Sequence, residues 1–212
     1  MRETEEVVPQ STMELYCKLM TRVKHRILEA RQLVLTAKDE RAAVYAAIQL
    51  RIAIEEVAVA SFVGNRPVLE TLNLGISKVS WQTSRNRLKA LNSEYWPTGV
   101  EVVTHPDGQI EWLTKENRIT ESEVPEIWGK LSSLLHARNP FREKINWREI
   151  IEYEKTLVSR LTETLNEHVL HLYDSDHLLC GQFWADPPHF YVFRALSAED
   201  ENTARNPRNK QS

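Results

Sequence analysis

Apolar residues recur at helical spacing over most of this chain. Near the N-terminus, Leu19, Val23 and Ile27 lie four positions apart and would form one buried helix face. The same pattern, read together with the capping residues Asp39 and Asn146 and with Gly or Pro stops, predicts further helices. The five predicted helices span about 12–36, 41–63, 77–91, 123–137 and 146–166. Short connections between such segments favour antiparallel neighbours.

Two other regions contain runs of β-branched and apolar residues, and turn residues lie between these runs. Gly99–Thr104 and Gln109–Leu113 flank a Pro-Asp-Gly turn, which is typical of a hairpin. Near the C-terminus, Val169–Tyr173, Leu178–Trp184 and Phe190–Leu196 are strand-like runs. They predict an antiparallel meander.

These elements predict a mainly α fold. We expect an antiparallel helical bundle of about five helices with an inserted β-hairpin and a C-terminal antiparallel β-meander. The predicted parts are a flexible N-terminus at 1–11, the bundle at 12–168 with its hairpin at about 99–113, the meander at 169–197 packed on the bundle, and a disordered tail at 198–212.

Composition places the chain among ordinary globular proteins. Its 212 residues are 42% apolar and 27% charged, with a net charge of −3, so the whole molecule is no polycation. The N-terminus has no apolar run of the kind found in secretory signals, and Cys17 and Cys180 lie far apart. We therefore expect a cytoplasmic protein with reduced thiols. Arg51, Glu55 and Glu56 interrupt the apolar stretch 42–64 and argue against a membrane span.

A polar set on two otherwise apolar helices is the main candidate for chemistry. Arg51 and Glu55 share one face of the central helix, while His136, Arg138 and Asn139 lie where a later helix ends before a proline. A histidine base and an arginine that stabilises phosphate charge could cleave RNA without a metal, with Glu55 orienting either one. The alternative is a structural network, in which Arg51 and Glu55 pair within their helix and His136 and Asn139 cap the later one.

In chain order, the predicted elements comprise the apolar helix with an Arg-and-Glu face, a later helix ending near Arg138-Asn139, a further long helix and a small sheet. This order of elements resembles that of the HEPN-like proteins. These are bacterial helical bundles, often dimeric, and many are metal-independent RNases of toxin–antitoxin and anti-phage systems. The resemblance covers about 12–169. Catalytic members carry Arg, four to six residues, then His; here Glu143 and Lys144 stand where that His would fall. The resemblance therefore implies a divergent or non-catalytic relative.

Four residues near the C-terminus have a spacing that metal sites use. His168 and His171 are three apart, as are His177 and Cys180. Zinc accepts imidazole and thiolate ligands in such pairs. On strands, however, residues three apart point to opposite faces, so a hairpin with half-buried histidines explains the pattern equally well. We expect no metal.

Basic residues are concentrated on the first and third predicted helices, with Trp81 beside them. If the two faces adjoin, they would suit RNA or single strands; a charged helix face otherwise serves for solvation. The candidate nucleic-acid-binding residues are Lys18, Arg22, Arg26, Lys78, Arg85, Arg87 and Lys89.

The chain contains no phosphate-binding loop, dinucleotide fingerprint, serine-hydrolase elbow or zincin motif, and we expect no cofactor. The leading hypothesis is a non-catalytic HEPN-like protein that self-associates, binds RNA or a protein partner, and acts in bacterial defence or a toxin–antitoxin pair. One alternative is a metal-independent RNase. Another is a scaffold without a nucleic-acid role, whose meander docks a partner through an apolar patch around Phe183, Trp184, Phe190 and Tyr191.

Overall fold

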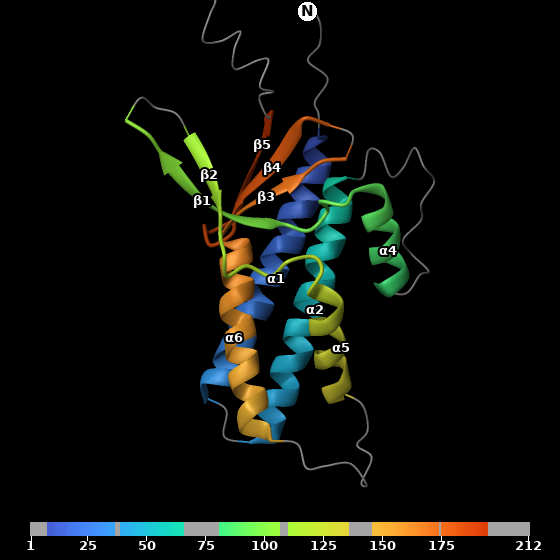
Figure 1. Ribbon diagram of the computed structural model, residues 1–212, viewed down its shortest axis with the longest axis vertical. Coiled ribbons are helices and arrows are strands. Elements are labelled where there is room, and N and C mark those ends of the chain that lie inside the picture. Colours follow the sequence, from blue (N-terminus) through green and yellow to red (C-terminus); the bar gives the residue numbers. More distant parts are fainter. Residues whose placement is uncertain are drawn as a thin grey trace, which may run out of the picture.

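A computed structural model describes residues 8–36, 39–65, 81–106, 110–135, 146–173 and 175–194. This part of the chain is mainly α-helical, with five helices and one antiparallel sheet (Figure 1). The helices are α1 (Gln10–Thr36), α2 (Glu40–Gly64), α4 (Trp81–Leu91), α5 (Val124–Leu135) and α6 (Trp147–Leu165). The strands are β1 (Thr98–Thr104), β2 (Ile110–Thr114), β3 (Glu167–His171), β4 (His177–Gln182) and β5 (His189–Arg194).

Helix α2 lies at the centre of the helical layer and explains why the sequence there is apolar on nearly every side. It contacts α1, which runs in the opposite direction, and also α4, α5 and α6. Leu50, Ala53 and Ile54 are fully buried among these neighbours. Asp39 caps its first turn as predicted, because the Asp39 carboxylate accepts hydrogen bonds from the amides of Arg41 and Ala42.

All five strands belong to one sheet with the order β2-β1-β3-β4-β5. Strands β1 and β2 pair antiparallel, and they are not separate from the meander, because Thr98 and Gly99 pair with Val169 and His168 of β3. The predicted boundary between the bundle and the meander, at 168/169, therefore falls inside β3. Gly99 permits the pairing, since a Cβ there would lie 2.6 Å from the carbonyl oxygen of Glu163 in α6.

The sheet covers one end of the helical layer (Figure 1). Leu170 and Leu179 are fully buried on its inner face, and Phe183, just after β4, is buried in the same core. Asn65 joins the end of α2 to this region: its side-chain amide donates to the carbonyl of Ser61, and its side-chain oxygen accepts from the amide of Tyr173. The helices thus fix the sheet from one side and leave its other face uncovered by any described helix.

Several predicted boundaries shift. Helix α1 begins at Gln10, so residues 10 and 11 belong to a helix and not to a flexible terminus, and α5 spans Val124–Leu135 within the predicted 123–137. Asn146 caps α6, accepting from the amide of Arg148 and donating to Glu149, as its sequence pattern indicated. Residues 77–80 of the third predicted helix and the tail 198–212 lie outside the described residues.

Candidate functional site

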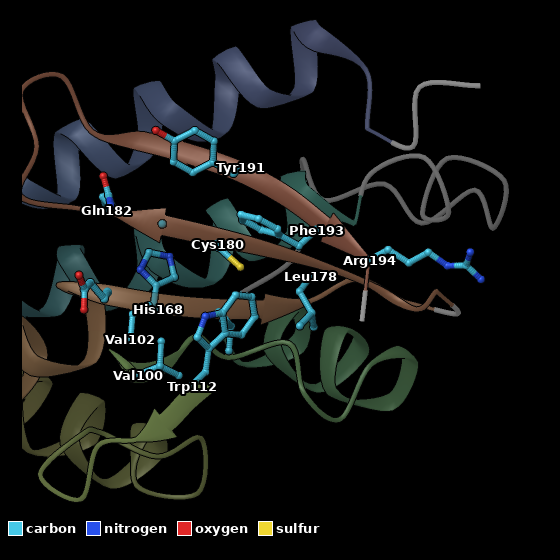
Figure 2. A pocket seen from close by; sticks show the side chains of 13 residues that line it. Val100, Val102, Trp112, His168, Leu178, Cys180, Gln182, Tyr191, Phe193 and Arg194 are labelled. Carbon is cyan, nitrogen blue, oxygen red and sulfur yellow. The ribbon is translucent and has the colours of Figure 1, made fainter. Parts of the chain in front are cut away.

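The outer face of the sheet is hollowed into a recess of about 530 Å³ (Figure 2). Strand register places its lining side chains next to one another: Val169 of β3 lies beside Cys180 of β4, which lies beside Tyr191 of β5. The apolar part of the lining draws on all five strands, with Val100, Trp112, Val169, Leu178, Tyr191 and Phe193 as members. Apolar clefts of this volume are typical of small-molecule sites.

Strong curvature of the sheet forms the recess. Trp112 lies on β2 and Phe193 on β5, the two outermost strands, yet their ring centroids are 5.8 Å apart in an edge-to-face contact. Tyr191 adds a third ring, 6.3 Å from Phe193. Tyr191 and Phe193 remain 49% and 45% exposed, so the recess opens to solvent beside these rings.

Polar groups stand at both ends of the recess. Glu167 and Gln182 are directly opposite each other in the β3–β4 register and line one end. Arg194 lines the other end and forms an ion pair with Asp176, whose pKa is lowered by the hydrogen bond from Arg194. The arginine charge is therefore compensated.

A buried histidine supports the recess from the helix side. His168 Nδ1 lies 2.8 Å from the carbonyl oxygen of Leu165, and Nε2 lies 3.2 Å from the Tyr16 hydroxyl. Burial lowers the pKa of His168 to about 4, against the opposing effect of the Leu165 hydrogen bond. Its imidazole is thus neutral near pH 7 and joins the sheet to α1. Gly181 makes room for it, since a Cβ there would lie 2.5 Å from His168 Cε1.

The structure excludes the zinc arrangement of His168, His171, His177 and Cys180. His168 is held by Tyr16 and Leu165, His171 faces Glu94, and His177 contacts Ser175 and Asp176. Among the described residues, no group of three or more potential ligands could hold a metal. The period of two along strands separates the ligands that the spacing suggested. Cys180 is a free thiol whose pKa burial raises to about 12, which disfavours a nucleophilic role.

The predicted catalytic pair on α2 takes part in a packed network. Arg51 Nε donates to Glu55 Oε1 over 3.1 Å, and Trp128 Nε1 of α5 donates to the same oxygen over 2.7 Å. The Arg51 guanidinium also lies 4.7 Å from the centre of the Trp128 ring, which stacks near Trp81 of α4. These contacts match the structural alternative for Arg51 and Glu55. His136, Arg138 and Asn139 lie outside the described residues.

Most of the described basic candidates bind carboxylates of the chain itself. Arg22 and Arg26 of α1 both pair with Glu56 of α2. Arg85 and Lys89 of α4 both pair with Glu121. Lys18 and Arg87 are exposed, and Lys78 lies outside the described residues. The four ion pairs lessen the positive potential that a nucleic-acid interface would need.

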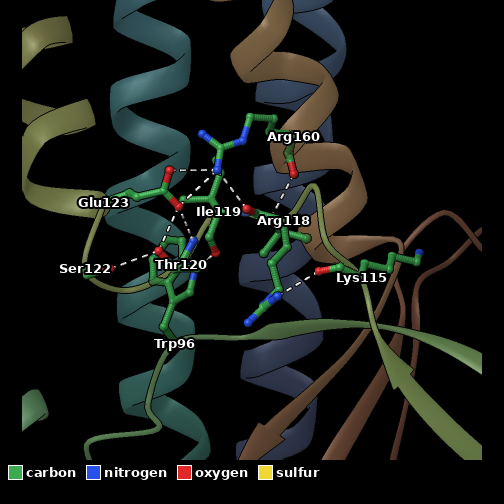
Figure 3. A network of polar contacts seen from close by, with 9 residues as sticks. Trp96, Lys115, Arg118, Ile119, Thr120, Ser122, Glu123 and Arg160 are labelled. Atoms are coloured by element: carbon green, nitrogen blue, oxygen red, sulfur yellow. Dashed lines mark hydrogen bonds and ion pairs between the residues drawn. The ribbon is translucent and has the colours of Figure 1, made fainter.

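A second polar network, which sequence patterns did not indicate, fixes the segment between β2 and α5 (Figure 3). Arg160 of α6 donates to the carbonyl of Arg118 and to the Glu123 carboxylate, each over 2.8 Å. Burial acts to raise the pKa of Glu123, but hydrogen bonds from Thr120 and Arg160 outweigh it and the pKa is lowered. Trp96 Nε1 donates to the carbonyl of Ile119. The network therefore has a structural role: it holds the segment between β2 and α5 against α6.

The aromatic patch that the meander was expected to expose is distributed differently. Phe183 is fully buried, and Trp184 and Phe190 pack partly against the core. Of the four named residues, Tyr191 is the one that lines the recess. Trp112 and Phe193 complete the aromatic side. Alternation along β5, with positions 191 and 193 on one face, was the signal in the sequence.

None of the described helices is long and apolar enough to cross a membrane. A scan against protein-family models, a search of curated proteins and a search of solved structures each gave no match. The geometry of the chain is therefore the basis for inferring its function.

Proposed function

We propose that this protein is a non-catalytic binding protein that takes a small apolar ligand into the recess of its curled sheet. The single observation that carries the proposal is the meeting of Trp112 and Phe193 across the sheet, which turns an exposed apolar face into a partly enclosed recess. An uncovered apolar surface is costly in water, and a concave one of about 530 Å³ can be filled by a molecule of drug-like size.

The polar networks support a binding role in preference to catalysis. Glu55 already accepts two hydrogen bonds, from Arg51 and Trp128, and Arg51 lies against the Trp128 ring. His168, beside the recess, is buried and neutral. Four further statements remain proposals beside this one. They are membership among the HEPN-like proteins, self-association, a cytoplasmic location, and a role in bacterial defence or a toxin–antitoxin pair.

Titration with the neutral apolar dye N-phenyl-1-naphthylamine tests the proposal, since its fluorescence rises in apolar surroundings. We expect saturable binding to the folded protein. Cys180→Phe fills the recess and should weaken binding at least about tenfold. Leu113→Phe is the control, because Leu113 is exposed on the hairpin and does not line the recess. Equal dye affinity in both folded variants would exclude the recess as the site.

A metal-independent RNase is the second candidate, and one observation favours it. The side chains of Arg51 and Glu55 stay 31% and 29% exposed, and α5, which ends one residue before His136, packs against α2. The test is incubation of the purified protein with labelled RNA in EDTA. Cleavage that His136→Ala abolishes and Cys180→Phe leaves intact would establish the RNase; we expect no cleavage.

A further inference from the structure

The charged residues around the recess indicate which sign of charge its ligand carries. Glu167 lines the recess at the first position of β3 and is only partly exposed. Within the described residues its carboxylate has no ion-pair partner, whereas Arg194, at the far end, is neutralised by Asp176. Gln182, opposite Glu167, adds an amide oxygen that accepts hydrogen bonds.

The Glu167 carboxylate favours a cationic ligand, and the aromatic side of the recess also favours a positive charge. Trp112, Tyr191 and Phe193 form a cluster with neighbouring centroids 5.8 and 6.3 Å apart. The faces of such rings carry partial negative charge and attract cations, ammonium groups among them. A carboxylate and three rings around one apolar volume would repel an anionic head group and attract a cationic one.

We propose that the recess binds an apolar amine, with the hydrocarbon part against Val100, Val169 and Leu178 and the ammonium group between Glu167 and the aromatic cluster. This inference rests on the proposed function and adds the chemical class of the ligand. The ammonium group would donate hydrogen bonds to the Glu167 carboxylate and to the Gln182 side-chain oxygen. The hydrocarbon would replace water along the strands.

Three ten-carbon probes that differ only in their head group test the proposal: decylamine, decanol and decanoate. Each competes with the naphthylamine dye at pH 8, with decylamine and decanoate below their micelle concentrations and decanol below its solubility limit. We expect decylamine to displace the dye at a concentration about tenfold lower than decanol, and decanoate to be the weakest competitor. Glu167→Gln should remove the preference for the amine over decanol.

Glu101→Gln is the matched control, because Glu101 is exposed on β1 at a position that alternates with the lining residues Val100 and Val102. It should keep the amine preference. If decanol displaces the dye and decylamine has no advantage, or if Glu167→Gln keeps that advantage, the amine assignment is wrong and the apolar site stands. If neither the dye nor decanol binds, the proposed function fails and the amine assignment fails with it.

Discussion

Trp112 and Phe193 belong to opposite edges of a five-stranded sheet, and their rings meet edge to face at 5.8 Å. The contact requires the sheet to curl through all of its strands, and it closes the recess on one side. Phe193 stays 45% exposed, so the contact is not part of the buried core. Its role is to stabilise the curvature of the sheet.

Removing either ring should loosen the curl. We expect Trp112→Ala and Phe193→Ala each to weaken dye binding, and the two changes to be coupled by about 0.5–1.5 kcal/mol in a double-mutant cycle of urea unfolding. Additive losses, with no coupling term, would mean that the rings do not meet in solution.

A buried carboxylate in α6 makes stability depend on pH. Glu154 is fully buried, neither of its oxygens has a hydrogen-bond partner among the described residues, and burial raises its pKa to about 8. As pH rises above the ordinary value of 4.5, the unfolded chain loses this proton while the folded chain keeps it, so stability falls up to about pH 8.

His168 acts in the opposite direction, because its lowered pKa favours the unfolded chain as pH falls from 6.5 toward 4. The range from pH 6.5 to 8 therefore isolates Glu154. We expect the free energy of unfolding to fall by about 1–2 kcal/mol across it, and Glu154→Gln to remove that slope. Glu152→Gln, at an exposed site of the same helix, should keep it. An unchanged slope in Glu154→Gln would contradict the burial of this group.

Two glycines should respond to alanine in opposite directions. Gly99→Ala brings a Cβ within 2.6 Å of the Glu163 carbonyl oxygen, against helix backbone that cannot yield, and should cost about 2 kcal/mol or more. Gly129 lies within α5 with nothing in the way of a Cβ, so Gly129→Ala should stabilise the protein by about 0.5–1 kcal/mol. Thermal unfolding compares the two, and a harmless Gly99→Ala would refute the close approach of β1 to α6.

The Arg51–Glu55–Trp128 network should matter for stability and not for ligand binding. Trp128→Phe removes the indole donor to Glu55 while keeping an aromatic ring beside Arg51, at an expected cost of about 1 kcal/mol. Dye affinity should stay the same, since none of the three residues lines the recess. A loss of binding without a loss of stability would give this network a role that we do not assign to it.

Much of the fold follows from local patterns. The apolar stripe of α1, the Asp39 cap and the Asn146 cap depend on residues close in sequence, which is why they were predictable. The pairing of β1 with β3 joins segments about 70 residues apart. It depends on the fit of Gly99 against α6, which no spacing reveals.

The candidate site was harder to predict for the same reason. The pairing of Arg51 with Glu55 could be read from a spacing of four, but its third member, Trp128, comes from another helix. The recess needs the order of five strands and their curvature. Without that order, Trp112 and Phe193 are two isolated aromatic residues.

Chemical-shift mapping with isotope-labelled protein and decanol tests the central claim most directly. We expect saturable amide shifts concentrated on the strand residues that line the recess, such as Val102, Val169, Cys180 and Tyr191, and their loss in Cys180→Phe. Shifts confined to the helices, or none at concentrations where decanol remains dissolved, would contradict a ligand site on the curled sheet.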